Sequence, residues 1–130
     1  MKADHFAFQV SDLDAAIAFY TDTIGLKLRF KEIDVEHHEA YAFLELEGGD
    51  LELLQRLDEA GRPAAFSKPE VGPPYTPHLA LATSDLDALL ATVVARGVPV
   101  VKGPLEMPGK VRWVYLSDPD HNIIEIVQWM

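Results

Sequence analysis

The chain has 130 residues, of which 48% are hydrophobic and 25% are charged. This composition fits one folded domain and excludes an intrinsically disordered chain. A formal net charge of -10 argues against nucleic acid as a partner, and the absence of cysteine excludes disulfides and thiolate metal ligands.

The first strand and helix are predicted at the start of the chain. Residues 5–10 alternate between apolar side chains and polar or small ones, which is typical of a half-buried strand. Ser11 is predicted to cap the helix that follows, and Gly25 to end it. Short β-type runs come next, at 26–30, 40–46 and 50–55.

Residues 56–77 are predicted to form a linker or lid, because they hold five prolines and two glycines without hydrophobic periodicity. After them the pattern returns. A strand begins at His78, Ser84 is predicted to cap a helix that stops at Arg96-Gly97, and β-type runs lie at 99–102, 112–116 and 122–129. We therefore expect one α+β domain over 1–130, made of two βαβββ modules at 1–55 and 78–130.

The two modules are copies of each other. The segment His5–Ala18 aligns without a gap on His78–Ala91, with eight of fourteen positions identical. At the same offset of 73, the run LELLQ at 51–55 aligns with IEIVQ at 124–128. Two separate segments that share one offset indicate an internal duplication. The strands of the two copies are expected to form a cupped mixed sheet with the helices packed outside.

Four ionisable residues recur on strands that are otherwise apolar. His5 and His78 open the two equivalent first strands, and Glu52 and Glu125 lie within the two equivalent last strands. A buried ionisable group needs a partner or a function. Two imidazoles and two carboxylates suit one divalent ion such as Ni, Co, Zn, Fe or Mn. A single histidine or glutamate on a strand is common and needs no function. A duplicated fold, however, has little structural reason to keep both residue types in both copies.

The segments DHFAFQVSDLDAAIAFYTDTIGL, PHLALATSDLD and DPDHNIIEIV resemble the vicinal oxygen chelate superfamily, which includes glyoxalase I, bleomycin-binding proteins and extradiol dioxygenases. The resemblance covers nearly the whole chain and is nearest to bacterial glyoxalase I. It implies the glyoxalase fold. It also places the metal ligands on His5, Glu52, His78 and Glu125, the four residues that the repeat selects.

The resemblance implies a metal-dependent lyase or isomerase of the lactoylglutathione lyase type. Such an enzyme chelates vicinal oxygens of a small substrate and transfers a proton through an enediolate intermediate, with Glu125 or Glu52 as the proton-transfer group. The sequence leaves the choice between the two glutamates open. Two alternatives remain: a non-catalytic protein that sequesters an antibiotic or another small molecule, and an extradiol-type dioxygenase.

The candidate substrate contacts are Gln9, Arg56, Lys110 and Arg112. Gln9 and Arg56 stand where glutathione-using relatives of the resembled family place Arg and Asn, which argues against glutathione as the thiol. We expect a cytoplasmic homodimer that binds a small-molecule substrate and neither nucleic acid nor membrane. Pairing of the modules within one chain or between two chains is left open.

Overall fold

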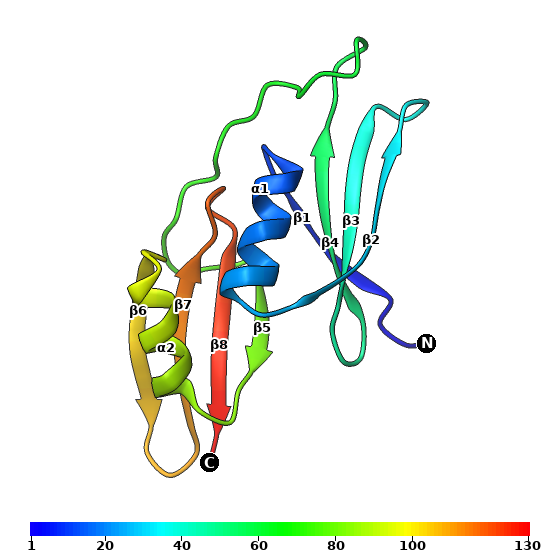
Figure 1. The fold of residues 1–130 in the computed structure, drawn as a ribbon. Coiled ribbons are helices and arrows are strands. Elements are labelled where there is room, and N and C mark those ends of the chain that lie inside the picture. The colour runs from blue at the N-terminus through cyan, green and yellow to red at the C-terminus, as the bar shows by residue number, and fades with distance from the viewer. The chain divides into compact units, whose positions relative to one another are not determined.

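The computed structural model describes residues 1–130 as two compact units, Met1–Ser67 and Lys68–Met130. The first contains β1 (His5–Gln9), α1 (Leu13–Ala18), the π-helical turn η1 (Phe19–Thr23), β2 (Lys27–Asp34), β3 (Glu39–Glu45) and β4 (Asp50–Arg56). The second contains β5 (His78–Ala82), α2 (Leu86–Ala95), β6 (Val100–Met107), β7 (Val111–Ser117) and β8 (Ile123–Trp129). Each unit thus has the predicted βαβββ order (Figure 1), and the α+β class is confirmed.

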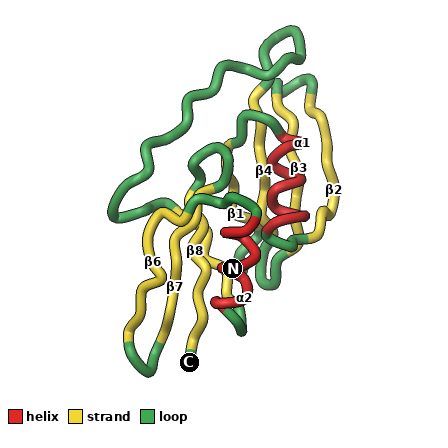
Figure 2. Tube along the Cα trace, turned by 60° about the vertical axis from the view of Figure 1, so that its left-hand side comes forward, coloured by secondary structure: helices red, strands yellow, loops and turns green.

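Each unit is built on a four-stranded mixed sheet. The strand orders are β1-β4-β3-β2 and β5-β8-β7-β6, so the last strand of each module lies beside its first. That central pair is parallel and the other neighbours are antiparallel. Figure 2 shows the strands in yellow and the long loop between β4 and β5 in green. The boundary between the units, after Ser67, falls inside this loop. No helix has the length and apolar character needed to cross a membrane.

The helix of each unit covers one face of its sheet. Alternate residues of β3 and β4 are buried beneath α1. In the second unit α2 contacts β8, and the residues buried on the equivalent face are Val114, Leu116, Ile124 and Ile126, although Val111, Ile123 and Val127 of the other face are buried as well. The opposite face of each sheet, here called the site face, carries the other set of alternating residues. In the first unit these include His5, Ala7, Tyr41, Phe43, Glu52 and Arg56, and in the second unit His78, Ala80, Trp113, Tyr115, Glu125 and Trp129.

A repeated glutamine anchors each helix to its sheet. The backbone N–H of Leu13, the first residue of α1, donates to Oε1 of Gln55 at 2.8 Å. The N–H of Leu86, the first residue of α2, donates to Oε1 of Gln128 at 2.9 Å. The first N–H groups of a helix have no partner within the helix, so a strand side chain that accepts from one of them fixes where the helix begins.

The predicted N-caps, Ser11 and Ser84, are wrong by one residue. Asp12 caps α1 by accepting from the N–H of Ala15 at 3.0 Å, and Asp85 caps α2 by accepting from Ala88 at 2.9 Å. Serine and aspartate are both good N-cap residues, so N-cap propensity alone does not choose between the adjacent Ser and Asp of the sequence Ser-Asp-Leu-Asp. The glutamine bond to the residue after each aspartate provides the missing constraint.

The edge strands are longer than predicted. β2 reaches Asp34 instead of Phe30, and almost all its residues are exposed, so no buried alternation marked it in the sequence. β6 reaches Met107 instead of Lys102, although Gly103-Pro104 lies inside it. Irregular register between Lys102 and Leu105 accommodates the proline, which an edge strand tolerates because one side of its backbone needs no partner.

A salt bridge between helix and sheet completes the second unit. Nη1 and Nη2 of Arg112 in β7 donate to the two carboxylate oxygens of Asp87 in α2, at 3.0 and 2.8 Å. The bidentate bond with Arg112 lowers the pKa of Asp87 and raises that of Arg112. Arg112 therefore lies on the helix side of β7, away from the site face.

We predict that Gln55→Leu destabilises the protein by about 1–3 kcal/mol, because the buried N–H of Leu13 loses its acceptor while side-chain volume is nearly kept. The free energy of unfolding from urea titration measures this. The matched control is Glu59→Leu, on an exposed turn, for which the change should stay within about 0.5 kcal/mol. A Gln55→Leu protein as stable as the control would show that water accepts the hydrogen bond from the Leu13 N–H equally well.

A second prediction concerns acid stability. The lowered pKa of Asp87 means that its carboxylate stabilises the folded state above the ordinary pKa of aspartate, and that this contribution is lost as the pH falls through the lower folded-state value. Asp87→Asn should therefore unfold more easily than wild type at neutral pH, and the two proteins should converge in acid. The control is the same substitution in an Arg112→Ala background, where neutral-pH stability should no longer depend on residue 87.

Candidate metal and ligand site

The parallel register of the first and last strands brings a histidine and a glutamate together in each unit. His5 lies beside Asp50 and Ala7 lies beside Glu52, so His5 and Glu52 are diagonal neighbours on the site face. His5 Nε2 is 3.1 Å from Glu52 Oε2. The equivalent register of β5 and β8 leaves His78 Nε2 2.8 Å from Glu125 Oε2. The duplication in the sequence is therefore a duplication of a His–Glu pair in space.

The other ring nitrogen of each histidine faces an acceptor. His5 Nδ1 is 2.5 Å from Asp4 Oδ1, and His78 Nδ1 is 2.8 Å from the backbone carbonyl oxygen of Tyr75. A carbonyl oxygen only accepts, so His78 Nδ1 is the donor to Tyr75, and this bond orients the ring so that Nε2 points at Glu125. An acceptor that fixes Nδ1–H and orients Nε2 is the usual support of a metal-ligating histidine.

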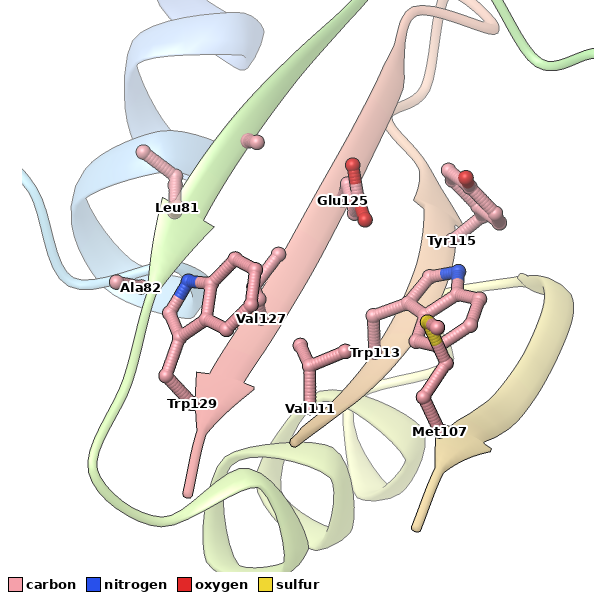
Figure 3. A pocket seen from close by; sticks show the side chains of 10 residues that line it. Leu81, Ala82, Met107, Val111, Trp113, Tyr115, Glu125, Val127 and Trp129 are labelled. Atoms are coloured by element: carbon pink, nitrogen blue, oxygen red, sulfur yellow. The ribbon is translucent and has the colours of Figure 1, made fainter. Parts of the chain in front are cut away.

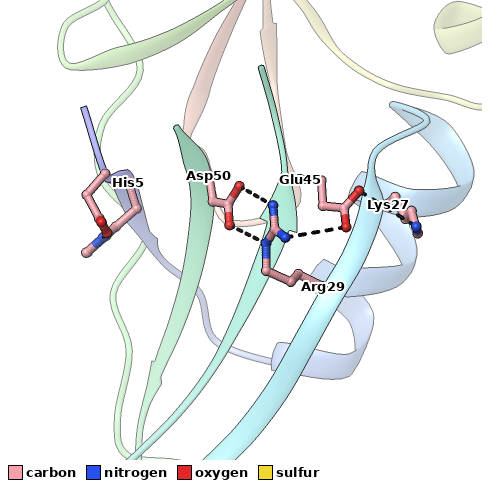
Figure 4. Close-up of polar contacts among 6 residues, drawn as sticks. His5, Lys27, Arg29, Glu45 and Asp50 are labelled. Atoms are coloured by element: carbon pink, nitrogen blue, oxygen red, sulfur yellow. Dashed lines mark hydrogen bonds and ion pairs between the residues drawn. The ribbon is translucent and has the colours of Figure 1, made fainter. Parts of the chain in front are cut away.

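The carboxylates around His5 have separate partners. The hydrogen bond to Asp4 is the main cause that raises the pKa of His5, and the charge of Glu52 adds to it. Asp50 accepts two hydrogen bonds from Arg29, at 2.7 and 3.1 Å, which lower its pKa. Figure 4 shows this ion-pair network, which continues from Arg29 to Glu45 and Lys27. Asp50 is thus engaged by Arg29, and Glu52 is the carboxylate that faces His5 Nε2.

An aromatic ring on the neighbouring strand contacts each histidine. Phe43 is the cross-strand partner of Glu52 and meets the His5 ring edge-on, with centroids 5.1 Å apart. Tyr115 is the partner of Glu125 and meets the His78 ring in the same way at 5.6 Å. The ring of Tyr75 stacks on Tyr115 at 4.9 Å. Self-comparison of the sequence did not pair Phe43 with Tyr115, because the two residues differ in identity and are separated by 72 positions, not 73.

A cavity of about 480 Å³ lies on the site face of the second unit and includes Glu125 in its wall. Figure 3 shows the side chains around it, which come from β5, β6, β7 and β8. They are Ala80, Leu81, Ala82, Met107, Val111, Trp113, Tyr115, Glu125, Val127 and Trp129. The volume is in the range of small-molecule sites in proteins. The glutamate of one His–Glu pair thus borders a space that a ligand can occupy.

The other predicted site residues are dispersed. Gln9 and Arg56 end β1 and β4 on the site face of the first unit. Lys110 lies in the exposed turn between β6 and β7, and Arg112 is bound to Asp87 on the helix side. His37, which is not among the predicted site residues, lies in an exposed turn, where its Nδ1 is 2.7 Å from Asp34 Oδ2.

No group of three or more His, Cys, Asp or Glu side chains has the geometry of a metal site. The donor chemistry of the two pairs nevertheless fits a divalent ion. Each pair offers one imidazole Nε2 and one carboxylate, with the imidazole Nδ1 already bound, and these are donors that Ni, Co, Zn, Fe and Mn accept.

Comparisons with known proteins match one superfamily over nearly the whole chain. The sequence model of the Glyoxalase/Bleomycin resistance protein/Dioxygenase superfamily matches residues 2–126. The lactoylglutathione lyase GLX1 of Arabidopsis thaliana is 32% identical over 126 residues, which cover 95% of this chain and 43% of that protein. A probable lactoylglutathione lyase of Vibrio cholerae is 31% identical over 129 residues, covering 95% of this chain and 88% of that one.

One similar solved structure is named for ligand binding. TnmS3, an antibiotic binding protein from Streptomyces sp. CB03234, superposes with a TM-score of 0.70 at 30% identity. The match covers 100% of this chain and 97% of TnmS3. Relatives named as lyases and a relative named as a binder thus resemble this chain to a similar degree.

Proposed function

We propose that this chain, which belongs to the Glyoxalase/Bleomycin resistance protein/Dioxygenase superfamily, is a metal-dependent lyase of the glyoxalase I type that acts on a small molecule with vicinal oxygens. The observation that carries the proposal is the repeated His–Glu pair. In both units Nε2 of the histidine faces the glutamate while Nδ1 is held by an acceptor. The superfamily also contains proteins of other activities, so the site must support the assignment.

The proposed metal ligands are His5, Glu52, His78 and Glu125. Joining the two pairs on one ion is part of the proposal, as is a homodimer of twofold symmetry, in which a site draws its pairs from one chain or from both. When bound, the divalent ion would act as a Lewis acid toward the vicinal oxygens and make the adjacent C–H group acidic. Gln9 and Arg56, on the site face with His5 and Glu52, are proposed to contact the substrate.

Glu125 is proposed as the proton-transfer group and Glu52 as its counterpart. The carboxylate of Glu125 lines the cavity, where it can reach a bound ligand, whereas Glu52 lies beside the Arg29–Asp50 network. The base takes the proton from the carbon that bears the hydroxyl and thioether groups and returns it to the adjacent carbonyl carbon. In the same conversion the hydroxyl hydrogen passes to the former carbonyl oxygen, so the substrate as a whole is neither oxidised nor reduced. A base positioned in this way is worth about 100- to 10,000-fold in rate.

The proposed ligand set predicts metal content. Wild-type protein loaded with Ni, Co, Mn, Fe or Zn and dialysed should retain one equivalent per chain of its preferred ion, measured by elemental analysis. His5→Ala and His78→Ala should each lower the affinity by about tenfold or more, because each removes a donor. His37→Ala removes an exposed histidine and should change nothing. No bound metal under any loading would refute the proposed enzyme.

The proposed base predicts a loss of turnover without a loss of metal. Glu125→Gln keeps an oxygen donor but cannot accept the proton, so kcat for a 2-oxoaldehyde hemithioacetal should fall by about 100-fold or more. Glu52→Gln should lower it less. Elemental analysis of each variant is the control. Wild-type rates in both variants with metal retained would overturn the role of the glutamates, and a larger loss in Glu52→Gln would assign the base to the first unit.

A second candidate function is sequestration of an antibiotic or similar small molecule without catalysis. The similarity to TnmS3 and the apolar cavity support it. It predicts tight binding of a small molecule by metal-free protein and no turnover. The metal analysis above separates the two candidates, because sequestration requires no ion.

A further inference from the structure

The cavity of the second unit has aromatic walls and almost no charge. Trp113, Tyr115 and Trp129 face it from β7 and β8, and Met107, Val111 and Val127 fill in between them (Figure 3). Trp129 and Met107 are 72% and 50% exposed, which is unusual for large apolar side chains on one surface. Aromatic side chains bind planar rings well through offset and edge-on stacking.

Small residues form the opposite wall. Ala80 and Ala82 of β5 are both exposed on the site face, where longer side chains would occupy the space in front of Trp129 and Glu125. The ring of Tyr75 stacks on Tyr115, and the backbone carbonyl oxygen of Tyr75 accepts a hydrogen bond from His78 Nδ1. The aromatic wall and the His78–Glu125 pair are thereby connected, so a ring bound in the cavity lies next to the proposed chemistry.

No cation lines the cavity. Glu125 is the single charged residue among the ten that surround it. Arg112, between the lining residues Val111 and Trp113, is turned to the helix side by Asp87. The chain as a whole carries a formal charge of -10. An anionic group bound among the aromatic residues, away from the His78–Glu125 pair, would leave water without gaining a cationic side chain as a partner, which is costly.

We infer that this cavity binds a neutral aromatic group, and that it discriminates against anionic ligands such as the glutathione part of a hemithioacetal. The inference builds on the proposed function in one respect: the bound ring is the substrate's own substituent next to the vicinal oxygens. The substrate class is then an aryl-substituted, uncharged one. The binding preference itself requires neither metal nor turnover, so it can be tested separately.

Two probes with the same ring skeleton test the charge preference. N-phenyl-1-naphthylamine is neutral, and 8-anilino-1-naphthalenesulfonate adds one sulfonate. Both tryptophans of the chain lie in the cavity wall, so excitation of tryptophan should transfer energy to a probe bound there. The neutral probe should bind with strong transfer, and the sulfonate should bind about tenfold or more weakly, because its charge has no partner. Equal affinities, or no binding of the neutral probe, would overturn the inference.

A matched pair of variants locates the probe. Ala82→Phe fills the cavity and should abolish binding of N-phenyl-1-naphthylamine. Ala95→Phe makes the same change at an exposed position of α2 and should leave binding intact. Unchanged binding in Ala82→Phe would refute the site, and circular dichroism verifies the fold of both variants. Binding of the neutral probe without any binding of metal would support this inference and refute the proposed lyase. Binding of metal without binding of the probe would refute this inference and leave the proposed lyase standing.

Discussion

The parallel register between the first and last strands of each module is the constraint on which the site depends. In both units the histidine lies two positions along the ladder from the glutamate, and this places their side chains on one face of the sheet. A slip of one residue would turn Glu52 or Glu125 under the helix, into an apolar layer where an unpaired carboxylate is costly. Burial of Leu51, Leu53 and their counterparts on β8 therefore fixes the position of the polar pair as much as it forms the core.

The same strands also position the helices. Gln55 and Gln128 lie on the helix faces of β4 and β8, three residues after the glutamates, and accept from the first N–H group of α1 and α2. One short run of sequence thus supplies a carboxylate to the site face and a helix anchor to the other. This double role explains why LELLQ and IEIVQ resemble each other more closely than the strands between them. It also ties the start of each helix to the register that forms the His–Glu pair.

Much of this could be predicted from the sequence because it is carried by periodicity and by the duplication. The order of elements, the faces of the central strands and the repeated pairs follow from alternation and from the offset of 73. The remainder depends on contacts between residues that no pattern links. Tyr75 lies in a proline-rich loop without periodicity, yet it holds His78 and stacks on Tyr115. Asp4 precedes the repeat and has no counterpart in the second copy, where Pro77 stands. Both edge strands are longer than predicted: in β2 nearly every residue is exposed, so no alternation marked its second half, and in β6 Gly103-Pro104 interrupts the strand pattern.

The duplication makes the two glutamates equivalent in sequence, but their surroundings have diverged. Glu52 lies on a face that carries ion pairs, with Arg29 bound to Asp50 and Asp4 bound to His5. Glu125 lies in the wall of an apolar cavity, with Tyr115 beside it and no Lys or Arg among the lining residues. A general base must come within reach of the carbon from which it takes the proton, and the cavity beside Glu125 offers room for a ligand at that distance. The two site faces have thus diverged while the residue types of the two His–Glu pairs have not, and this difference in surroundings is the basis on which we propose unequal roles for Glu52 and Glu125.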